Sequence, residues 1–547
     1  MIYPIPQKNE LTGKDIFVKS VSLSGEFKAI AEKVFRDYNI NCNNGLNVVF
    51  TYENSKETTY AEGIARLTDE KYIIIASENE VIVKASCEKG AFRGAHTLAK
   101  LIVKNELKEG MLTDFPLFRK RGYIEGFYGP TWENIKRLSV MKLMASYGMN
   151  TFFYAPKDDI YHREKWRDLY PENELTQLKN LFDYACDNFL DFHWTIGPGL
   201  TYKYTSDEDF TLLINKIKSV YDIGVRNFGL LLDDIAWEFQ YEEDGKKFDS
   251  IVDAHIFLVN KTYTALKEID ASIKLTVCPT QYSGNCNEYY ITKFGCNIPA
   301  DVDLFWTGAE ICSRVLTVRE SDEFTYATNH LPLYWDNYPV NDCEMFQEMH
   351  LGALIGRDKE LYKHCEGIIS NVMEFAECSK IPLMTIADFL WNPLSYNPDD
   401  SLKNAHRETL GDDADSFFYF ADHLGVSCLT RYSSSYMGQV LSKVSFLESS
   451  GKKKESLELL GSYVSDMRKC LTLISDTSVP IFAEMQKWVK KFSMCCDLLD
   501  NIYIAKENPS QENKKILSDE LQKYNSDGTI LTGFCLREMA EKTLMKI

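Results

Sequence analysis

Several common signals are missing from this chain of 547 residues. It has no run of about 18 apolar residues, so no membrane-spanning helix is expected. It also lacks an excess of positive charge, since 61 lysines and arginines face 80 aspartates and glutamates, for a formal net charge of −19. Because nucleic acids and cell membranes are themselves anionic, this balance argues against both as partners.

A disulfide framework is not indicated either. The 15 cysteines are an odd number and follow no repeated spacing. We therefore expect reduced thiols, as in a cytoplasmic protein, and the first twenty residues contain no apolar stretch typical of a signal peptide. No HExxH zinc motif, P-loop, GxSxG elbow or dinucleotide fingerprint occurs, so motifs predict no cofactor.

Periodicity divides the chain into three predicted domains. Residues 1–115 mix short apolar strands with helical segments, which predicts a small α/β domain. Residues 116–400 repeat an apolar strand followed by a helical stretch, and residues 401–547 are mostly of helical character. The last region is predicted to form a helical bundle with a structural role. Pairing of two copies through this bundle is compatible with its pattern, although nothing in the pattern requires it.

The middle region contains eight candidate strands that alternate with helical stretches. Eight such units predict an α/β protein built on a (β/α)8 TIM barrel, in which the active site lies at the carboxyl ends of the strands. The strands are expected at residues 122–127, 151–155, 191–196, 227–232, 274–277, 303–306, 332–335 and 367–370. The residues that follow them are rich in polar, aromatic and glycine side chains, as expected of a pocket rim.

The most informative feature is the carboxylate pair Asp233 and Asp234, which follows the apolar run 228–232. Two carboxylates this close cannot both ionise at the usual cost, so one pKa is expected to rise, which leaves an acid beside a base. Such a pair suits the cleavage of a glycosidic bond, but it would also serve as a Mg²⁺ site or as a helix cap. Further carboxylates that could complete a metal site are Asp158, Asp159, Asp336 and Asp342.

Three further clusters follow other predicted strands, and each has a structural alternative. The segment 121–129 places glycines, including Gly126, where the backbone can approach a ligand, or it simply makes a tight turn. Lys157 can point into a pocket as a hydrogen-bond donor, or lie in solvent beside acidic helix caps. The segment 335–342 offers an aromatic wall with amides and carboxylates, which suits a sugar ring, but a buried Trp before an Asx turn has the same sequence.

Together these clusters resemble glycoside hydrolase family 84, the β-N-acetylglucosaminidases that include O-GlcNAcase and its bacterial relatives. The resemblance is strongest at residues 122–163, 233–234, 278–282, 306–308 and 335–342. It implies a retaining exo-β-N-acetylglucosaminidase that hydrolyses terminal β-linked GlcNAc on O-GlcNAc peptides or glycans. In this family the 2-acetamido oxygen of the substrate is the nucleophile and forms an oxazoline intermediate, an exception to the usual scheme of two carboxylates.

The resemblance also implies a role for each residue around the pair. Asp233 would orient and polarise the acetamido N–H, and Asp234 would protonate the leaving oxygen and then activate water. The Gly126 carbonyl and Lys157 would hold ring hydroxyls. Asp342 and Asn371 would bind hydroxyls on the far side of the ring.

The remaining implied contacts concern the acetamido group and the pocket wall. Tyr282 would bind the acetamido oxygen, and Cys278 would help to enclose the acetyl methyl group. Trp335 would form part of the wall, with Asn337 near the acid and the acetamido group. Cys286 stands at a position on the aglycone side that often carries a larger residue in this family, so the leaving-group preference stays open.

Two other classes are kept as alternatives. A glycan-binding protein without activity would keep the sugar-binding residues but lose one carboxylate of the pair, and both are present here. A metal-dependent hydrolase would use the aspartate cluster, and inactivation by a chelator would reveal it. The resemblance favours a hydrolase that needs no metal or cofactor and whose partner is a GlcNAc-bearing glycan or glycopeptide.

Overall fold

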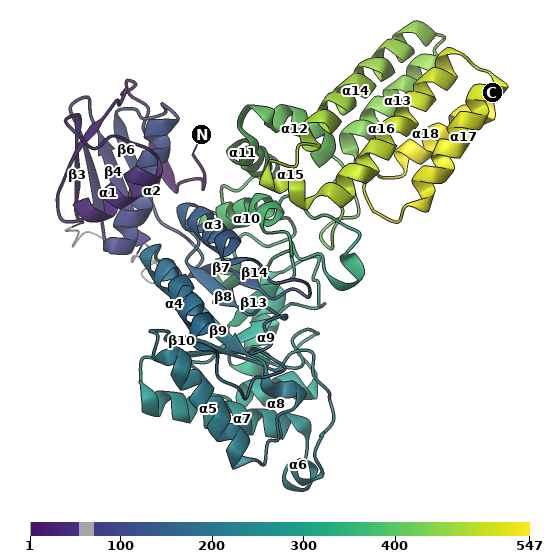
Figure 1. The fold of residues 1–547 in the computed structure, drawn as a ribbon. Helices are drawn as coiled ribbons and strands as arrows, with labels where there is room; N and C mark the ends of the chain where they lie inside the picture. The colour runs from purple at the N-terminus through teal and green to yellow at the C-terminus, as the bar shows by residue number, and fades with distance from the viewer. Residues whose placement is uncertain (1, 54–69) are drawn as a thin grey trace.

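The computed structural model describes residues 2–53 and 70–547, and its N-terminal part is built on a six-stranded sheet. The elements of this part are β1 (Lys8–Glu10), β2 (Val21–Ser24), α1 (Lys28–Asp37), β3 (Leu46–Tyr52), β4 (Tyr72–Ala76), β5 (Glu80–Ala85), α2 (Glu88–Val103) and β6 (Gly110–Asp114). The strand order is β1-β6-β4-β5-β3-β2. This part of the chain is coloured purple to blue in Figure 1. The predicted small α/β unit is therefore confirmed, whereas the boundaries at residues 115 and 400 stay predictions.

Eight parallel strands close into a barrel in the central part of the chain (Figure 1). They are β7 (Lys120–Glu125), β8 (Thr151–Tyr154), β9 (Asp191–Ile196), β10 (Asn227–Leu231), β11 (Lys274–Cys278), β12 (Asp303–Trp306), β13 (Pro332–Asp336) and β14 (Gly367–Asn371). Pairing of β14 with β7 completes the ring. The predicted barrel is confirmed, and every predicted strand agrees with an observed one to within two residues.

Helices surround the barrel after seven of its strands but not after β13. They are α3 (Asn134–Ser146), α4 (Glu172–Asp187), α5 (Asp207–Tyr221), α6 (Glu242–Lys247), α7 (Ile251–Ile269), α8 (Tyr289–Cys296), α9 (Val318–Thr328) and α10 (Ala376–Trp391). Residues 337–366 contain only the 3₁₀ turns Cys343–Met345 and Leu361–Lys363. The expectation of eight strand–helix units is wrong here, because this segment instead packs against the C-terminal region, with Leu351 N donating to Leu424 O at 3.1 Å.

The C-terminal part is helical, as predicted. Its helices are α11 (Pro398–Leu410), α12 (Ala414–Ala421), α13 (Ser435–Ser449), α14 (Lys453–Ile474), α15 (Pro480–Glu484), α16 (Gln486–Glu507), α17 (Gln511–Ser526) and α18 (Cys535–Lys546). The bundle extends away from the barrel and is coloured light green to yellow in Figure 1. Helix α16 buries Trp488, Phe492, Cys496 and Leu499 at helical spacing, which fixes its inner face. Within residues 2–53 and 70–547, no helix is both long and apolar enough to cross a membrane.

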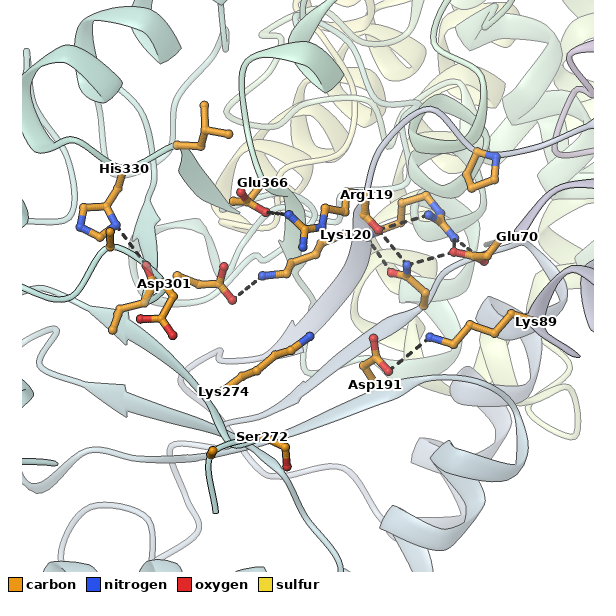
Figure 2. Close-up of a pocket in the computed structure, with 18 of the residues that line it drawn as sticks. Glu70, Lys89, Arg119, Lys120, Asp191, Ser272, Lys274, Asp301, His330 and Glu366 are labelled. Carbon is orange, nitrogen blue, oxygen red and sulfur yellow. Dashed lines mark hydrogen bonds and ion pairs between the residues drawn. The ribbon is translucent and has the colours of Figure 1, made fainter. Parts of the chain in front are cut away.

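A cavity of about 820 Å³ lies at the amino ends of the barrel strands, where residues of the N-terminal part also line it (Figure 2). Many of its charged side chains pair with one another. Arg119 binds Glu366 at 3.0 Å, and Lys89 binds Asp191 at 3.7 Å. In TIM-barrel enzymes this end of the barrel serves stability, whereas catalysis takes place at the opposite end.

Glu70 connects the N-terminal part to the barrel at this junction. Its carboxylate binds Arg121 of β7 at 2.7 Å and Arg93 of α2 at 2.9 Å. Burial alone raises the pKa of Glu70, but the two guanidinium groups outweigh that effect and lower it to about 2. Arg93 also donates to the carbonyl of Ala145 at 2.8 Å. The charges at this end of the barrel therefore join two parts of the chain.

Candidate active site

A second cavity of about 820 Å³ opens at the carboxyl ends of the strands. All the site residues predicted from the sequence line it, although they come from six different strand ends and their following loops. They are Gly126, Lys157, Asp233, Asp234, Cys278, Tyr282, Trp335, Asn337, Asp342 and Asn371. The barrel brings them together because parallel strands present their carboxyl ends on the same side.

Asp233 is the inner member of the carboxylate pair. It is 7% exposed, and its Oδ2 lies 2.6 Å from Nζ of Lys157. Burial alone raises the pKa of Asp233, but the Lys157 ammonium and the Arg163 guanidinium outweigh that effect and hold it below its usual value. Because the same contact raises the pKa of Lys157 despite its burial, the two groups form an ion pair at neutral pH. Asp233 is thus held as a carboxylate.

Asp234 is exposed and has a different environment from its neighbour. Its backbone has a φ of 51°, a left-handed conformation that is uncommon for residues other than glycine and that concentrates at functional sites. The two carboxylate oxygens accept hydrogen bonds from Tyr128 Oη and Tyr282 Oη, each at 2.8 Å. Arg163 in turn donates to Tyr128 Oη at 2.9 Å. These donors hold the Asp234 carboxylate in one orientation at the mouth of the cavity.

The opposite side of the cavity is a network of amides around Asn337. Its Oδ1 accepts from Trp335 Nε1 at 3.0 Å and from Asn371 Nδ2 at 2.9 Å. Its own Nδ2 donates to the carbonyl of Ile311 at 2.7 Å. A Cβ added at Gly126 would come 2.6 Å from the Trp335 ring, so only glycine fits at this position. The wall formed by these residues is therefore fixed before any ligand binds.

Several residues at the cavity were missed by the sequence reasoning. Tyr128 lies within a segment that the sequence did single out, but its contact with Asp234 bridges 106 positions and leaves no local signal. Arg163 received no role from the sequence. Cys428 and Arg431 come from the helical C-terminal region, which was assigned only a structural role, and both line the cavity.

Cys286 differs from its expected place. Its side chain is 9% exposed and lines a separate cavity of about 250 Å³, so it does not border the carboxylate pair. Its backbone has a φ of 62° in the loop after β11. This loop carries Tyr282 toward the pair while Cys286 packs beside the separate cavity, and the leaving-group preference stays open.

Two of the four aspartates that could have completed a metal site are engaged elsewhere, whereas Asp342 lines the cavity. Asp336 pairs with Arg357 at 2.5 Å, and Asp159 accepts from Tyr154 and Tyr170 at 3.1 and 2.7 Å. In the parts of the chain that the structure describes, no group of three or more His, Cys, Asp or Glu side chains could hold a metal ion.

Comparison with known proteins assigns the family. A sequence model described as beta-N-acetylglucosaminidase matches residues 121–422, which include the barrel and every predicted site residue. The chain belongs to the β-N-acetylglucosaminidase family. The resemblance to family 84 is thus confirmed. Membership of this family also confirms the expectation of a glycoside hydrolase.

Relatives of this β-N-acetylglucosaminidase-family chain agree with the assignment. A mutant of the Thermobaculum terrenum O-GlcNAc hydrolase is 31% identical, with a TM-score of 0.74 over 79% of this chain and 95% of that one. CpGH84B is 26% identical, with a TM-score of 0.84 over 99% and 100% of the two chains. Protein O-GlcNAcase of Rattus norvegicus is 29% identical over 272 residues, which is 49% of this chain but only 29% of that relative. The chain therefore matches less than a third of the length of this curated relative.

Proposed function

We propose that this chain is a retaining exo-β-N-acetylglucosaminidase that hydrolyses terminal β-linked GlcNAc by substrate-assisted catalysis, through an oxazoline intermediate. The proposal rests on the contrast between two neighbouring carboxylates. Asp233 is buried beside Lys157 and stays ionised, whereas Asp234 faces the open cavity between two tyrosine hydroxyls. One carboxylate is thereby suited to stabilising positive charge, and the other to exchanging a proton with the substrate.

In the first step the acetamido oxygen of the substrate attacks the anomeric carbon. A carbon–oxygen bond forms within the sugar while the glycosidic bond breaks, and protonated Asp234 gives its proton to the leaving oxygen. Positive charge develops on the acetamido group as the ring closes. The Asp233 carboxylate, which accepts a hydrogen bond from the acetamido N–H, stabilises that charge electrostatically.

In the second step water opens the oxazoline. Asp234, now a carboxylate, takes a proton from the water as its oxygen bonds to the anomeric carbon. The bond from the anomeric carbon to the acetamido oxygen breaks, which restores the acetamido group. Because each step inverts the anomeric centre, the product retains the β configuration.

Tyr282 would change partners when the sugar binds. In the structure its hydroxyl donates to Asp234 at 2.8 Å, whereas the proposed mechanism requires it at the acetamido oxygen. Binding of the sugar would therefore exchange the hydrogen bond from Tyr282 to Asp234 for one from Tyr282 to the acetamido oxygen.

Tyr282→Phe is expected to lower kcat about 10²-fold, in the range found when one donor to a developing charge is removed. The phenyl ring keeps the shape of the cavity but cannot orient the acetamido oxygen. Steady-state kinetics with an aryl β-N-acetylglucosaminide measure the effect. Tyr326→Phe, at a side chain that is 91% exposed, serves as the control and should behave as the wild type. An unchanged kcat in Tyr282→Phe would remove the proposed role.

The function itself is tested with a panel of substrates and a chelator. We expect hydrolysis of an aryl β-N-acetylglucosaminide, of O-GlcNAc peptides and of GlcNAc-terminated oligosaccharides, with β-GlcNAc as the first product seen by NMR. EDTA should leave the rates unchanged. Sugar binding without hydrolysis would instead identify a glycan-binding protein, and loss of activity in EDTA that added Mg²⁺ reverses would identify a metal-dependent hydrolase.

The same panel ranks the substrates. Because the relatives are named for O-GlcNAc, we include a GlcNAc-bearing peptide or protein in the proposed substrate class.

A cytoplasmic location and pairing of two copies through the helical region also belong to the proposal, since both rest on the sequence alone.

A further inference from the structure

The segment after β13, where the barrel lacks a helix, connects the cavity to the C-terminal bundle. In place of a helix, β13 is followed by a segment that touches the candidate active site on one side and the bundle on the other. Residues 342–348, here called the 342–348 loop, form its central part. We propose that the C-terminal bundle positions this loop for substrate binding, with Trp488 as the main positioning residue.

The inner side of the 342–348 loop lines the cavity. Asp342, Cys343, Glu344 and Met345 all border it. The Asp342 carboxylate accepts a hydrogen bond from the backbone N of Tyr128 at 2.7 Å, which aims it at the space where the proposed function requires a ring hydroxyl. The inference therefore rests on the proposed function for what Asp342 binds, although not for how the loop is held.

The outer side of the loop is held by the bundle. The Gln347 carbonyl accepts hydrogen bonds from Trp488 Nε1 at 3.1 Å and from Ile530 N at 3.0 Å. The neighbouring Phe346 carbonyl accepts from Lys487 Nζ at 2.7 Å. Trp488 and Lys487 lie in the first turn of α16, and Ile530 lies between α17 and α18, so two separate segments of the bundle converge on adjacent carbonyls.

Within the loop itself there is little to fix its position. Asn341 Nδ2 donates to the carbonyl of Glu348 at 2.8 Å and closes its base. The backbone bonds within the loop are those of short turns, namely the 3₁₀ turn at 343–345 and the bond from Glu348 N to the Met345 carbonyl at 2.8 Å. A loop without a regular ladder depends on outside contacts for its geometry. Figure 1 shows α15, which precedes α16, beside α10 at the edge of the barrel, so the start of α16 is anchored close to the loop.

Trp488 links the bundle to both the barrel and the loop. Its side chain is 1% exposed, and its ring contacts Phe375, the residue before α10, edge to face at 5.4 Å. The indole is thus packed against the barrel while its Nε1–H holds the loop. A shift of the loop would move Asp342 relative to the ring hydroxyl, and small displacements of binding groups weaken hydrogen bonds steeply.

The test is Trp488→Phe, which keeps an aromatic ring against Phe375 and removes the Nε1–H donor. We expect KM for an aryl β-N-acetylglucosaminide to rise about fivefold, as for one lost hydrogen bond, with kcat within about twofold of the wild type. KM is the sensitive quantity because a ring hydroxyl bound by Asp342 is held in both the ground state and the transition state. The matched control is Trp391→Phe, which removes the bond from Trp391 Nε1 to Asp114 at 2.9 Å on the far side of the barrel.

Hydrogen exchange of the 342–348 loop gives a readout that does not depend on activity. We expect faster exchange of these amides in Trp488→Phe and wild-type rates in Trp391→Phe. If the wild type hydrolyses no GlcNAc substrate, the proposed function fails while exchange still tests how the loop is held. Unchanged exchange in Trp488→Phe, faster exchange with an unchanged KM, or an equal rise of KM in both variants would each overturn the inference. Should Trp488→Phe fail to fold, Lys487→Met decides, with the same changes expected on a smaller scale.

Discussion

Asp234→Asn is expected to lower kcat/KM about 10³-fold on substrates with an alkoxide leaving group, such as a GlcNAc-serine peptide, in the range for loss of a general acid. The amide cannot supply the proton that a poor leaving group needs. An aryl leaving group with a low pKa departs without that proton, so the first step of its hydrolysis should be much less affected. A plot of log kcat/KM against leaving-group pKa measures the difference, and its slope should be steeper in the variant.

Two further results would assign this effect to proton transfer. The basic limb of the pH profile of kcat/KM reports deprotonation of the acid and should disappear in Asp234→Asn. Azide attacks the intermediate without base catalysis, so it should restore turnover of aryl substrates. Asp183→Asn, which removes an exposed i,i+4 ion pair with Lys179, is the control and should match the wild type. Equal losses on aryl and alkyl glycosides would exclude the role of Asp234 as an acid.

The barrel could be predicted from the sequence because its strands are buried on both faces. Such strands read as continuous apolar runs, as 228–232 does, and the predicted strands end within two residues of the observed ones. The missing helix after β13 could not be predicted in this way. It depends on the packing of residues 337–366 against helices that lie far along the chain, and periodicity within a segment says nothing about a distant partner.

The candidate site was predictable to the extent that its residues follow strands directly. Asp233, Lys157 and Trp335 stand at or just after strand ends, so barrel geometry alone brings them to one cavity. Their electrostatics depended on contacts that sequence cannot supply. Repulsion within the pair predicts a raised pKa for one member, but the ion pair with Lys157, 76 positions away, lowers the pKa of Asp233 instead.

The contribution of the helical region was missed for a related reason. Arg431 lies in a segment between two helices, where a charged residue normally faces solvent, and its side chain is 76% exposed. Only the fold reveals that this segment lies at the mouth of the cavity. The same holds for Trp488, whose spacing in α16 predicts a core residue and gives no sign of a hydrogen bond to an active-site loop.

Replacing the 2-acetamido group of the substrate by a hydroxyl should abolish turnover. An aryl β-glucoside keeps the leaving group and the ring but loses the internal nucleophile, and well-placed intramolecular nucleophiles are worth effective molarities of about 10⁵ M or more. We therefore expect kcat/KM to fall at least about 10⁵-fold. Substrates with one, two or three fluorines on the acetyl group should show a stepwise fall in kcat, because fluorine withdraws electrons from the attacking oxygen.

Hydrolysis of the glucoside distinguishes two roles for Asp233, as nucleophile or as stabiliser of charge on the substrate. Both roles require an ionised carboxylate. An ionised carboxylate at the end of a barrel strand could itself attack the anomeric carbon, as in the usual retaining mechanism, and such an enzyme would hydrolyse the glucoside. With the acetamido oxygen as nucleophile, Asp233 only stabilises charge on the substrate. Asp233→Asn should then lower kcat about 10²-fold to 10³-fold and flatten the dependence on fluorine, since less of the developing charge is stabilised. Rapid hydrolysis of the glucoside by the wild type would show that the carboxylate is the nucleophile.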